Sequence, residues 1–231
     1  MRAISGGRRA ISCLLYVVLI YGAAAAQVPL TQVAGSSLQC PDAYISRCAD
    51  KLERDLSAAH PDIVRRNADE SFSIKLSNGR WLTPPNECLT CDFALELLRD
   101  NRYLAILSFG EEDLFWKLLD RQTGKIVSME GYPLFSPDGQ NIASVEADEM
   151  NINALDIYSV RSSGPAKVFS RILPTESWLA MNVCWADNAT LSYERLEFNT
   201  DTRKSGKPEV VVFSNGKWRI AAGGPRCAGT S

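Results

Sequence analysis

The sequence has few of the residues and motifs on which enzymes commonly depend. His60 is the only histidine in the 231 residues, so any Ser-His-Asp or Cys-His arrangement must use it. The sequence has no G-x-S-x-G segment, no glycine-rich phosphate loop and no D-x-[DN]-x-[DN]-G calcium loop. These absences favour a protein without catalytic activity. From the same absences we expect that the protein binds no metal and no cofactor.

Concentrated positive charge is absent as well. The formal net charge is −2, with 25 lysines and arginines against 27 aspartates and glutamates. Binding to a nucleic-acid backbone requires clustered Lys and Arg side chains that neutralise phosphates. The sequence therefore predicts that this protein does not bind nucleic acid.

The only long apolar run lies in the first 26 residues, which have the layout of a secretory signal peptide. Arg2, Arg8 and Arg9 come first, an apolar stretch follows over Ile11–Tyr21, and four alanines precede Gln27. The alternative is an uncleaved membrane anchor, but the apolar stretch is shorter than the ~20 residues that a spanning helix needs. We therefore expect a soluble periplasmic or secreted protein with no membrane span after cleavage.

Cysteine usage agrees with export. Of the seven cysteines, Cys13 lies in the signal segment, which leaves an even number in the mature chain. Six cysteines in an oxidising compartment predict a disulfide framework, for which about 15 pairings exist. The pairing that we favour is Cys40 with Cys48, Cys88 with Cys91, and Cys184 with Cys227, the first two on proximity alone.

The segment that begins at Cys40 predicts a helix. Ile45, Leu52 and Leu56 recur at helical spacing with small residues between them, and Pro61 is expected to end the helix. A Cys40–Cys48 bond would tie the start of this helix to its second turn. We divide the chain into a signal peptide (1–26), a leader with a disulfide-tied helix (27–66), and a β domain (67–231).

Strands and tight turns repeat from Phe72 onward. The stretch YPLFSPDGQNIASVEA (132–147) has a strand, a Pro-Asp-Gly turn and a second strand, and similar stretches occupy 93–108 and 182–197. Further hairpins are predicted at Asn78-Gly79, Thr123-Gly124, Ser163-Gly164-Pro165 and Asn215-Gly216. About four units of roughly forty residues result, a period typical of propeller blades. The first and last units supply about three strands each.

The segment Phe135–Ala143, FSPDGQNIA, resembles the repeat of TolB-type (WD40-like) bacterial β-propellers. The resemblance covers about residues 72–222, and the copy at Trp185-Ala186-Asp187-Asn188 is degenerate. It implies an all-β fold of about four propeller-like repeats, forming a small or partial β-propeller after a short N-terminal helix. The sequence is also compatible with a curved sandwich. The repeat carries no catalytic residues, and many exported propellers of this kind are binding scaffolds.

Two sets of residues are candidates for function. CLTC (88–91) contains a C-x-x-C pair, so Cys88 and Cys91 form a structural disulfide, pair with other cysteines, or exchange disulfides as a redox site. Trp178 lies in a connection between units, and Arg203, Lys204 and Lys207 lie in the polar connection FNTDTRKSGKPE (198–209). Binding residues concentrate on such loops.

The function that we expect is non-catalytic binding, with a protein or a component of the bacterial cell envelope as partner. The alternatives are a thiol-disulfide oxidoreductase that uses Cys88 and Cys91, a hydrolase built on paired loop carboxylates, and a secreted enzyme inhibitor. The acidic clusters at 111–113 and 146–149 are the carboxylates that a hydrolase or a calcium site would use.

Overall fold

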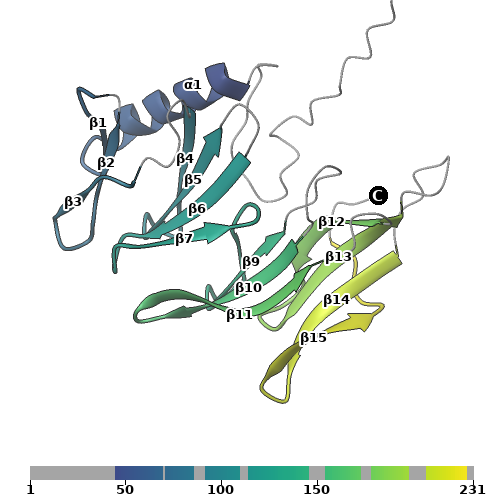
Figure 1. Cartoon of the computed structure of the whole chain (residues 1–231). Coiled ribbons are helices and arrows are strands. Elements are labelled where there is room, and N and C mark those ends of the chain that lie inside the picture. The colour runs from purple at the N-terminus through teal and green to yellow at the C-terminus, as the bar shows by residue number, and fades with distance from the viewer. Residues whose placement is uncertain are drawn as a thin grey trace, which may run out of the picture.

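A computed structural model of the chain describes residues 45–69, 71–85, 92–109, 114–145, 154–172, 178–197 and 207–227. Within these ranges the fold is all-β, with one helix and four antiparallel sheets, which confirms the predicted fold class. Each sheet is a meander whose strands follow one another in sequence order. Figure 1 shows the sheets in succession, with the first and the last at opposite ends of an open array.

The four sheets correspond to the predicted repeat units. The strands of the first sheet are β1 (Val64–Arg66), β2 (Phe72–Lys75) and β3 (Trp81–Leu82). Those of the second are β4 (Asp92–Leu98), β5 (Tyr103–Phe109), β6 (Leu114–Asp120) and β7 (Lys125–Met129). Those of the third are β8 (Leu134–Phe135), β9 (Asn141–Val145), β10 (Ala154–Arg161) and β11 (Gly164–Ile172). Those of the fourth are β12 (Trp178–Trp185), β13 (Thr190–Glu197), β14 (Lys207–Ser214) and β15 (Lys217–Ala222).

The hydrophobic core lies between neighbouring sheets. Among the described residues, one cluster joins the first and second sheets around Ile74 and Leu104, and another joins the second and third around Leu118 and Tyr158. A third cluster, which includes Leu191, joins the third and fourth sheets. Each inner sheet therefore buries both faces, as propeller blades do, because alternate side chains of a strand point to opposite faces.

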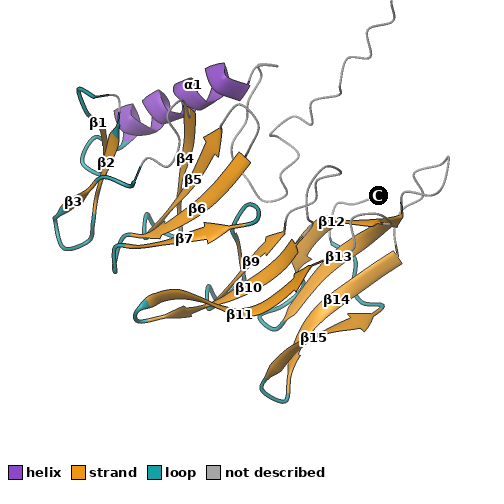
Figure 2. Ribbon diagram, in the orientation of Figure 1, coloured by secondary structure: helices purple, strands orange, loops and turns teal. Residues whose placement is uncertain are grey.

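Helix α1 (Ile45–Ala59) packs beside the first two sheets at one end of the array (Figure 2). It contacts β4, an edge strand of the second sheet, and β1 of the first. Leu52 packs against one core cluster and Leu56 against the next. The helix ends one residue before His60, as the following proline predicts. It covers a strand edge that would otherwise be open to pairing.

The repeated turn is built as the sequence predicts. Gly139 has φ +71, and its N–H donates to the carbonyl oxygen of Ser136 at 2.8 Å. Asp138 accepts a hydrogen bond from the Ser136 hydroxyl at 2.7 Å and from the backbone N–H of Gln140 at 2.9 Å. The side chain of Asp138 therefore closes the turn locally, which is the usual reason for aspartate at this position.

Equivalent turns of successive sheets also bind one another. A guanidinium N–H of Arg99, in the β4–β5 turn, donates to the carbonyl oxygen of Ser136 in the β8–β9 turn. The N–H of Asp138 donates to Oδ1 of Asn188 at 3.0 Å, which links the β8–β9 turn to the β12–β13 turn. The side-chain amide of Asn141 donates to the carbonyl oxygen of Asn188 at 3.2 Å. The repeat residues thus hold each of these sheets to the next.

The structure differs from the sequence predictions at three places. The fourth sheet has four strands, where about three were expected, because β12 pairs with β13 and extends the last unit. The hairpin predicted at Ser163-Gly164-Pro165 turns earlier, since β11 begins at Gly164. The strand β1 was not predicted, and it pairs with β2 although it lies in the segment assigned to the leader and helix.

Candidate functional site

Two residues predicted to contact a partner lie at the same end of the fourth sheet. Trp178 begins β12 and pairs with Glu197, while Lys207 begins β14 and pairs with Arg195. Because β13 runs between these two strands, the backbones of Trp178 and Lys207 are about two strand spacings apart, roughly 10 Å. Both residues were expected in connections, but the structure places each of them at the first position of a strand. We call this end of the sheet, where β12 and β14 begin and β13 ends, the open end.

Several predicted residues lie outside the described residues. This holds for the signal peptide, for both acidic clusters at 111–113 and 146–149, and for the side chain of Cys48. It also holds for Cys40, Cys88, Cys91, Arg203 and Lys204. The bonds proposed within 40–48 and 88–91 therefore stay predictions, and so does a redox role of the C-x-x-C pair. The segment 198–206, with Arg203 and Lys204, joins β13 to β14 at the open end.

One face of the open end carries a charged group that faces the third sheet. The hydroxyl of Tyr193 donates to Oε2 of Glu209 at 2.7 Å, and Arg195 forms an ion pair with the other oxygen of Glu209 at 3.7 Å. Burial of the phenol, followed by its hydrogen bond to Glu209, raises the pKa of Tyr193. Tyr193 therefore stays neutral and acts as a hydrogen-bond donor, while Glu209 is held between it and a cation.

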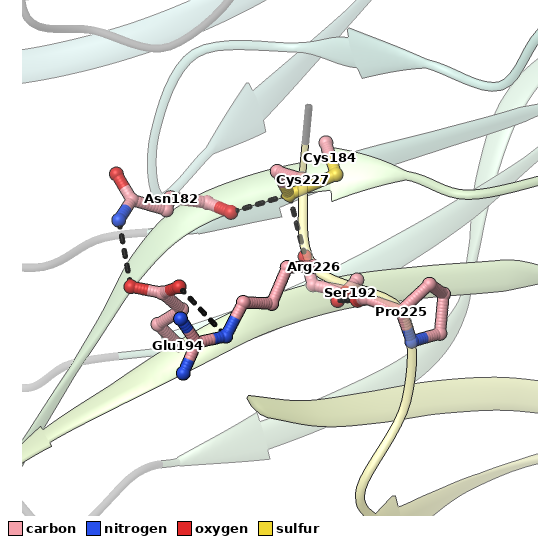
Figure 3. The surroundings of a disulfide bond; sticks show 7 residues. All are labelled: Asn182, Cys184, Ser192, Glu194, Pro225, Arg226 and Cys227. Carbon is pink, nitrogen blue, oxygen red and sulfur yellow. Dashed lines mark hydrogen bonds and ion pairs between the residues drawn. A yellow bond between two sulfur atoms is a disulfide. The ribbon is translucent and has the colours of Figure 1, made fainter. Parts of the chain in front are cut away.

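The opposite face carries a second charged group around Glu194, which alternates with Tyr193 and Arg195 along β13 (Figure 3). The amide of Asn182 donates to Oε2 of Glu194 at 2.8 Å, and Nε of Arg226 lies 3.9 Å from Oε1. Asn182 has φ +51 and sits in a bulge where the pairing of β12 with β13 shifts. A bulge redirects side chains at a strand edge. Here it directs the Asn182 amide to the carboxylate of Glu194, whose side chain is only 10% exposed.

The structure contains a disulfide beside this second group. Cys184 of β12 is bonded to Cys227, with a Cα–Cα distance of 5.8 Å that suits an unstrained bridge. The sulfur of Cys227 lies 2.7 Å from the carbonyl oxygen of Asn182. This contact is not a conventional hydrogen bond, because a bonded sulfur carries no proton. The disulfide fixes residue 227 against the fourth sheet.

The described residues contain no candidate metal centre, and His60 directly follows the helix. Across the described ranges, no three His, Cys, Asp or Glu side chains are grouped so that they could hold a metal ion. His60 follows the helix, its N–H donates to Leu56, and its carbonyl oxygen accepts from Ile63 and Val64. Its place in the chain is that of a helix-ending residue. No helix in the described part is long and apolar enough to span a membrane.

Sequence reasoning missed the charged residues that flank the open end. Tyr193 and Arg195 share one face of β13, and Ser192 and Glu194 share the other. Alternation along SYER indicates this division, but their partners are set by the register with β14 and by the bulge in β12. No local pattern in the sequence predicts either of these features.

Comparisons with known proteins give similar solved structures only. No protein-family model matches the sequence, and no curated protein matches it. A puromycin-hydrolyzing peptidase from Mycobacterium tuberculosis is similar with a TM-score of 0.38 and 15% identity, over 70% of this chain and 27% of that one. A protein assigned as TolB from Agrobacterium tumefaciens has a TM-score of 0.34 and 11% identity, over 66% of this chain and 59% of that one. TolB from Acinetobacter baumannii has a TM-score of 0.31 and 16% identity, over 77% of this chain and 46% of that one.

Two of these three structures are TolB proteins, the family that the FSPDG segment resembles. The chain spans 27% to 59% of the length of the three proteins. Every TM-score is below 0.5.

Proposed function

We propose that this chain is an exported, non-catalytic binding protein of the bacterial periplasm or cell envelope. Its partner is a protein or another envelope component, which it contacts through the open end of the fourth sheet. The observation that supports this most directly is the position of Trp178 and Lys207. These residues were selected from separate loops of the sequence, and the fold brings them to one end of one sheet.

The chemistry of the open end supports binding rather than catalysis. The described carboxylates there, Glu194 and Glu209, already have partners at hydrogen-bond or ion-pair distance. A carboxylate whose oxygens already accept a hydrogen bond and pair with a cation has fewer lone pairs left to contact a substrate. Such groups instead present a fixed pattern of charge, which gives specificity and steers association.

The rigidity of the scaffold also supports this role. The fourth sheet packs on the third through the cluster around Leu191 and Val211, and it is tied to residue 227 by the disulfide. Loops that join strands of a rigid sheet can carry binding residues without loss of the fold. The segment 198–206 is such a connection, and it contributes Arg203 and Lys204 to the proposed surface.

A site-specific photo-crosslinking experiment tests the proposal. The full chain is produced with a photoreactive residue at position 178 or 207, exported in the producing cells, irradiated, and examined by mass spectrometry. The control position is Lys217, an exposed residue that begins β15 at the opposite end of the same sheet. We expect the same adduct from positions 178 and 207, and none from 217.

Competition and charge reversal complete the test. An excess of unmodified protein is expected to suppress the adduct, and Lys207→Glu is expected to reduce adduct formation at position 178. Equal adducts at all three positions would contradict the open end as the binding surface. Turnover of a substrate by the purified chain, at a rate that tracks protein concentration, would contradict a purely binding role.

A further inference from the structure

The last strand of the third sheet, β11, is an edge strand. Within the described ranges it pairs with β10 alone, and no strand pairs with its other side (Figure 1). A strand edge of this kind presents backbone N–H and C=O groups that can pair with another chain, and proteins usually block it. The two halves of β11 differ in how far the edge is blocked.

The first half of β11 is blocked. Pro165 has no N–H to donate, and its carbonyl oxygen already accepts a hydrogen bond from Nζ of Lys125 at 2.7 Å. Val168 lies in a bulge, because the residues on either side of it pair with successive residues of β10. Proline and bulges are features by which natural edge strands avoid pairing with other chains.

The second half, Phe169–Ile172, lacks these features. It pairs with β10 in continuous register and contains no proline. Ile172 is 69% exposed, and Val168, at the bulge before this half, is 38% exposed. These are two of the three large hydrophobic side chains that are exposed among the described residues. An exposed apolar strand edge is a place where another chain can add a strand.

The backbone groups that point away from the sheet belong to Ser170 and Ile172. The N–H of Val160 donates at 2.8 Å to the carbonyl oxygen just before β9, so this residue of β10 directs its backbone groups towards β9. Successive residues of an antiparallel strand direct these groups alternately to the two neighbouring strands. Leu155 therefore directs its groups towards β11, where it pairs with Arg171. The residues on either side of Arg171 then direct their own groups outward.

The side chains of this half determine which segment fits. Phe169 packs against the cluster that joins the third and fourth sheets, so Arg171 shares that side and Ile172 lies on the other. Arg171 is exposed, and no carboxylate of the described ranges lies at ion-pair distance from it. A strand paired here would place successive side chains beside Arg171 and Ile172. An acidic residue suits the first position and an apolar residue suits the second.

This half of β11 adjoins the open end of the fourth sheet. β11 ends at Ile172 and β12 begins at Trp178, so only the connection 173–177 lies between them. A chain that contacts the open end can therefore also reach the edge of β11.

We propose that the partner is a protein that adds an extended segment to the edge of β11 along Phe169–Ile172. The segment alternates apolar and acidic side chains, with a carboxylate beside Arg171. Main-chain hydrogen bonds to Ser170 and Ile172 hold the segment, and its side chains give specificity, as in other cases of strand addition. The inference rests on the proposed binding function, to which it adds the chemistry of the partner.

Photo-crosslinking at position 172 tests the proposal. The full chain carries the photoreactive residue at 172, or at the exposed Ser162 in the turn before β11 as a control, and is irradiated in the producing cells. We expect the same polypeptide adduct at 172 as at 178, and none at 162. An adduct at 178 without one at 172 would overturn strand addition and leave the open end as the binding surface. The reverse result would support strand addition and contradict the open end, whereas a lipid or glycan adduct at 172 would overturn the proposal.

Two proline variants test the backbone pairing. Ser170→Pro removes an outward N–H from β11 and is expected to abolish the adduct at position 172. Ala222→Pro removes an outward N–H from β15, the edge strand of the fourth sheet, because the next residue, Gly223, donates inward to Pro208 at 3.1 Å. This control is expected to keep the adduct. Circular dichroism confirms that both variants are folded. An adduct that survives Ser170→Pro, or that is lost in Ala222→Pro alone, would overturn pairing with β11.

Charge reversal tests the acidic side chain of the partner without changing the backbone. Arg171→Glu is expected to lower the adduct yield at position 172 roughly tenfold, because like charges then face each other. Arg219→Glu reverses an exposed arginine of β15 and is expected to leave the yield unchanged. Equal yields from these two variants would overturn the proposed carboxylate beside Arg171.

Discussion

Replacing Arg99 by alanine removes a contact that joins the second sheet to the third. The guanidinium donates to the carbonyl oxygen of Ser136 and lies 5.2 Å from the centre of the Phe135 ring. It also lies over Gly139, where a Cβ atom would be 3.6 Å from the guanidinium carbon. Arg99 itself has φ +50, in the region that non-glycine residues rarely adopt.

The expected loss can be worked out contact by contact. A hydrogen bond from a charged group contributes about 1.5–3 kcal/mol, and a cation–π contact about 0.5–1 kcal/mol where solvent has access. Because both contacts are only partly buried, we expect Arg99→Ala to lower the free energy of unfolding by about 2–3 kcal/mol. Arg99→Gly loses the same contacts but relieves the positive φ, which is worth about 1 kcal/mol. It should therefore be the milder substitution.

Chemical denaturation followed by fluorescence measures both losses of unfolding free energy. In a separate thermal denaturation, the alanine variant is expected to melt roughly 4–12 °C below the parent, for a domain of this size. Arg80→Ala is the matched control, because Arg80 is exposed in the β2–β3 turn and its hydrogen bonds run through its backbone. A loss below about 0.5 kcal/mol for Arg99→Ala, or a glycine variant less stable than the alanine variant, would refute the reasoning.

Three further predictions concern burial, pH and export. Lys167→Ala leaves the fully buried carboxylate of Asp156 without its cation, so unfolding in urea should show a loss of about 1–3 kcal/mol, and no loss would contradict the role of this ion pair. The pKa of Asp138 is lowered from its usual 3.8, mainly by the hydrogen bond from the backbone N–H of Gln140. The stability that this shift provides is present above pH 3.8 and is lost as the pH falls through the lower pKa of the folded state. Asp138→Asn should therefore flatten the acid limb of a curve of stability against pH. The exported protein should begin at Gln27 by mass spectrometry, and a mass that includes residues 1–26 would contradict a cleaved signal.

The turns could be predicted from sequence because their causes are local. In Pro137-Asp138-Gly139 the proline sets φ, the aspartate side chain caps the turn and the glycine takes the positive φ. The structure forms that turn. Asn215 and Gly216 both have positive φ, as the Asn-Gly hairpin predicts. Turns at this spacing indicate that successive short strands pair antiparallel with one another. Whether the strands form a closed propeller, an open partial one or a curved sandwich depends on how the sheets pack.

The contacts between sheets could not be predicted in the same way. Arg99 and Ser136 are 37 positions apart, and Asp138 and Asn188 are 50 apart. A turn sequence does not indicate which distant carbonyl group the side chains of the turn will contact. β1 was missed because a strand of three residues is too short to show an alternating pattern, and its pairing with β2 depends on tertiary contacts.

The candidate site shows the same division between local and distant causes. Trp178 and Lys207 could be selected from sequence because they flank polar connections, yet the end of the sheet where they meet depends on β13 pairing with both β12 and β14. The bulge at Asn182 shifts that pairing partway along β12. The register of β13 with β14 is continuous, so that pairing determines which residues of β13 face the third sheet.

The two terminal sheets of the described array limit apolar exposure in different ways. In a closed propeller each sheet face packs on a neighbour, whereas an open array leaves two terminal faces that must be made soluble. On the first sheet the guanidinium of Arg65 lies over the Trp81 ring, and the buried hydroxyl of Ser73 exchanges hydrogen bonds with Asn67 and Thr83. On the fourth sheet residues 223–227 cover part of the outer face. Among the described residues, both terminal faces therefore have groups that limit apolar exposure, and the strand ends between these faces carry the connecting segments.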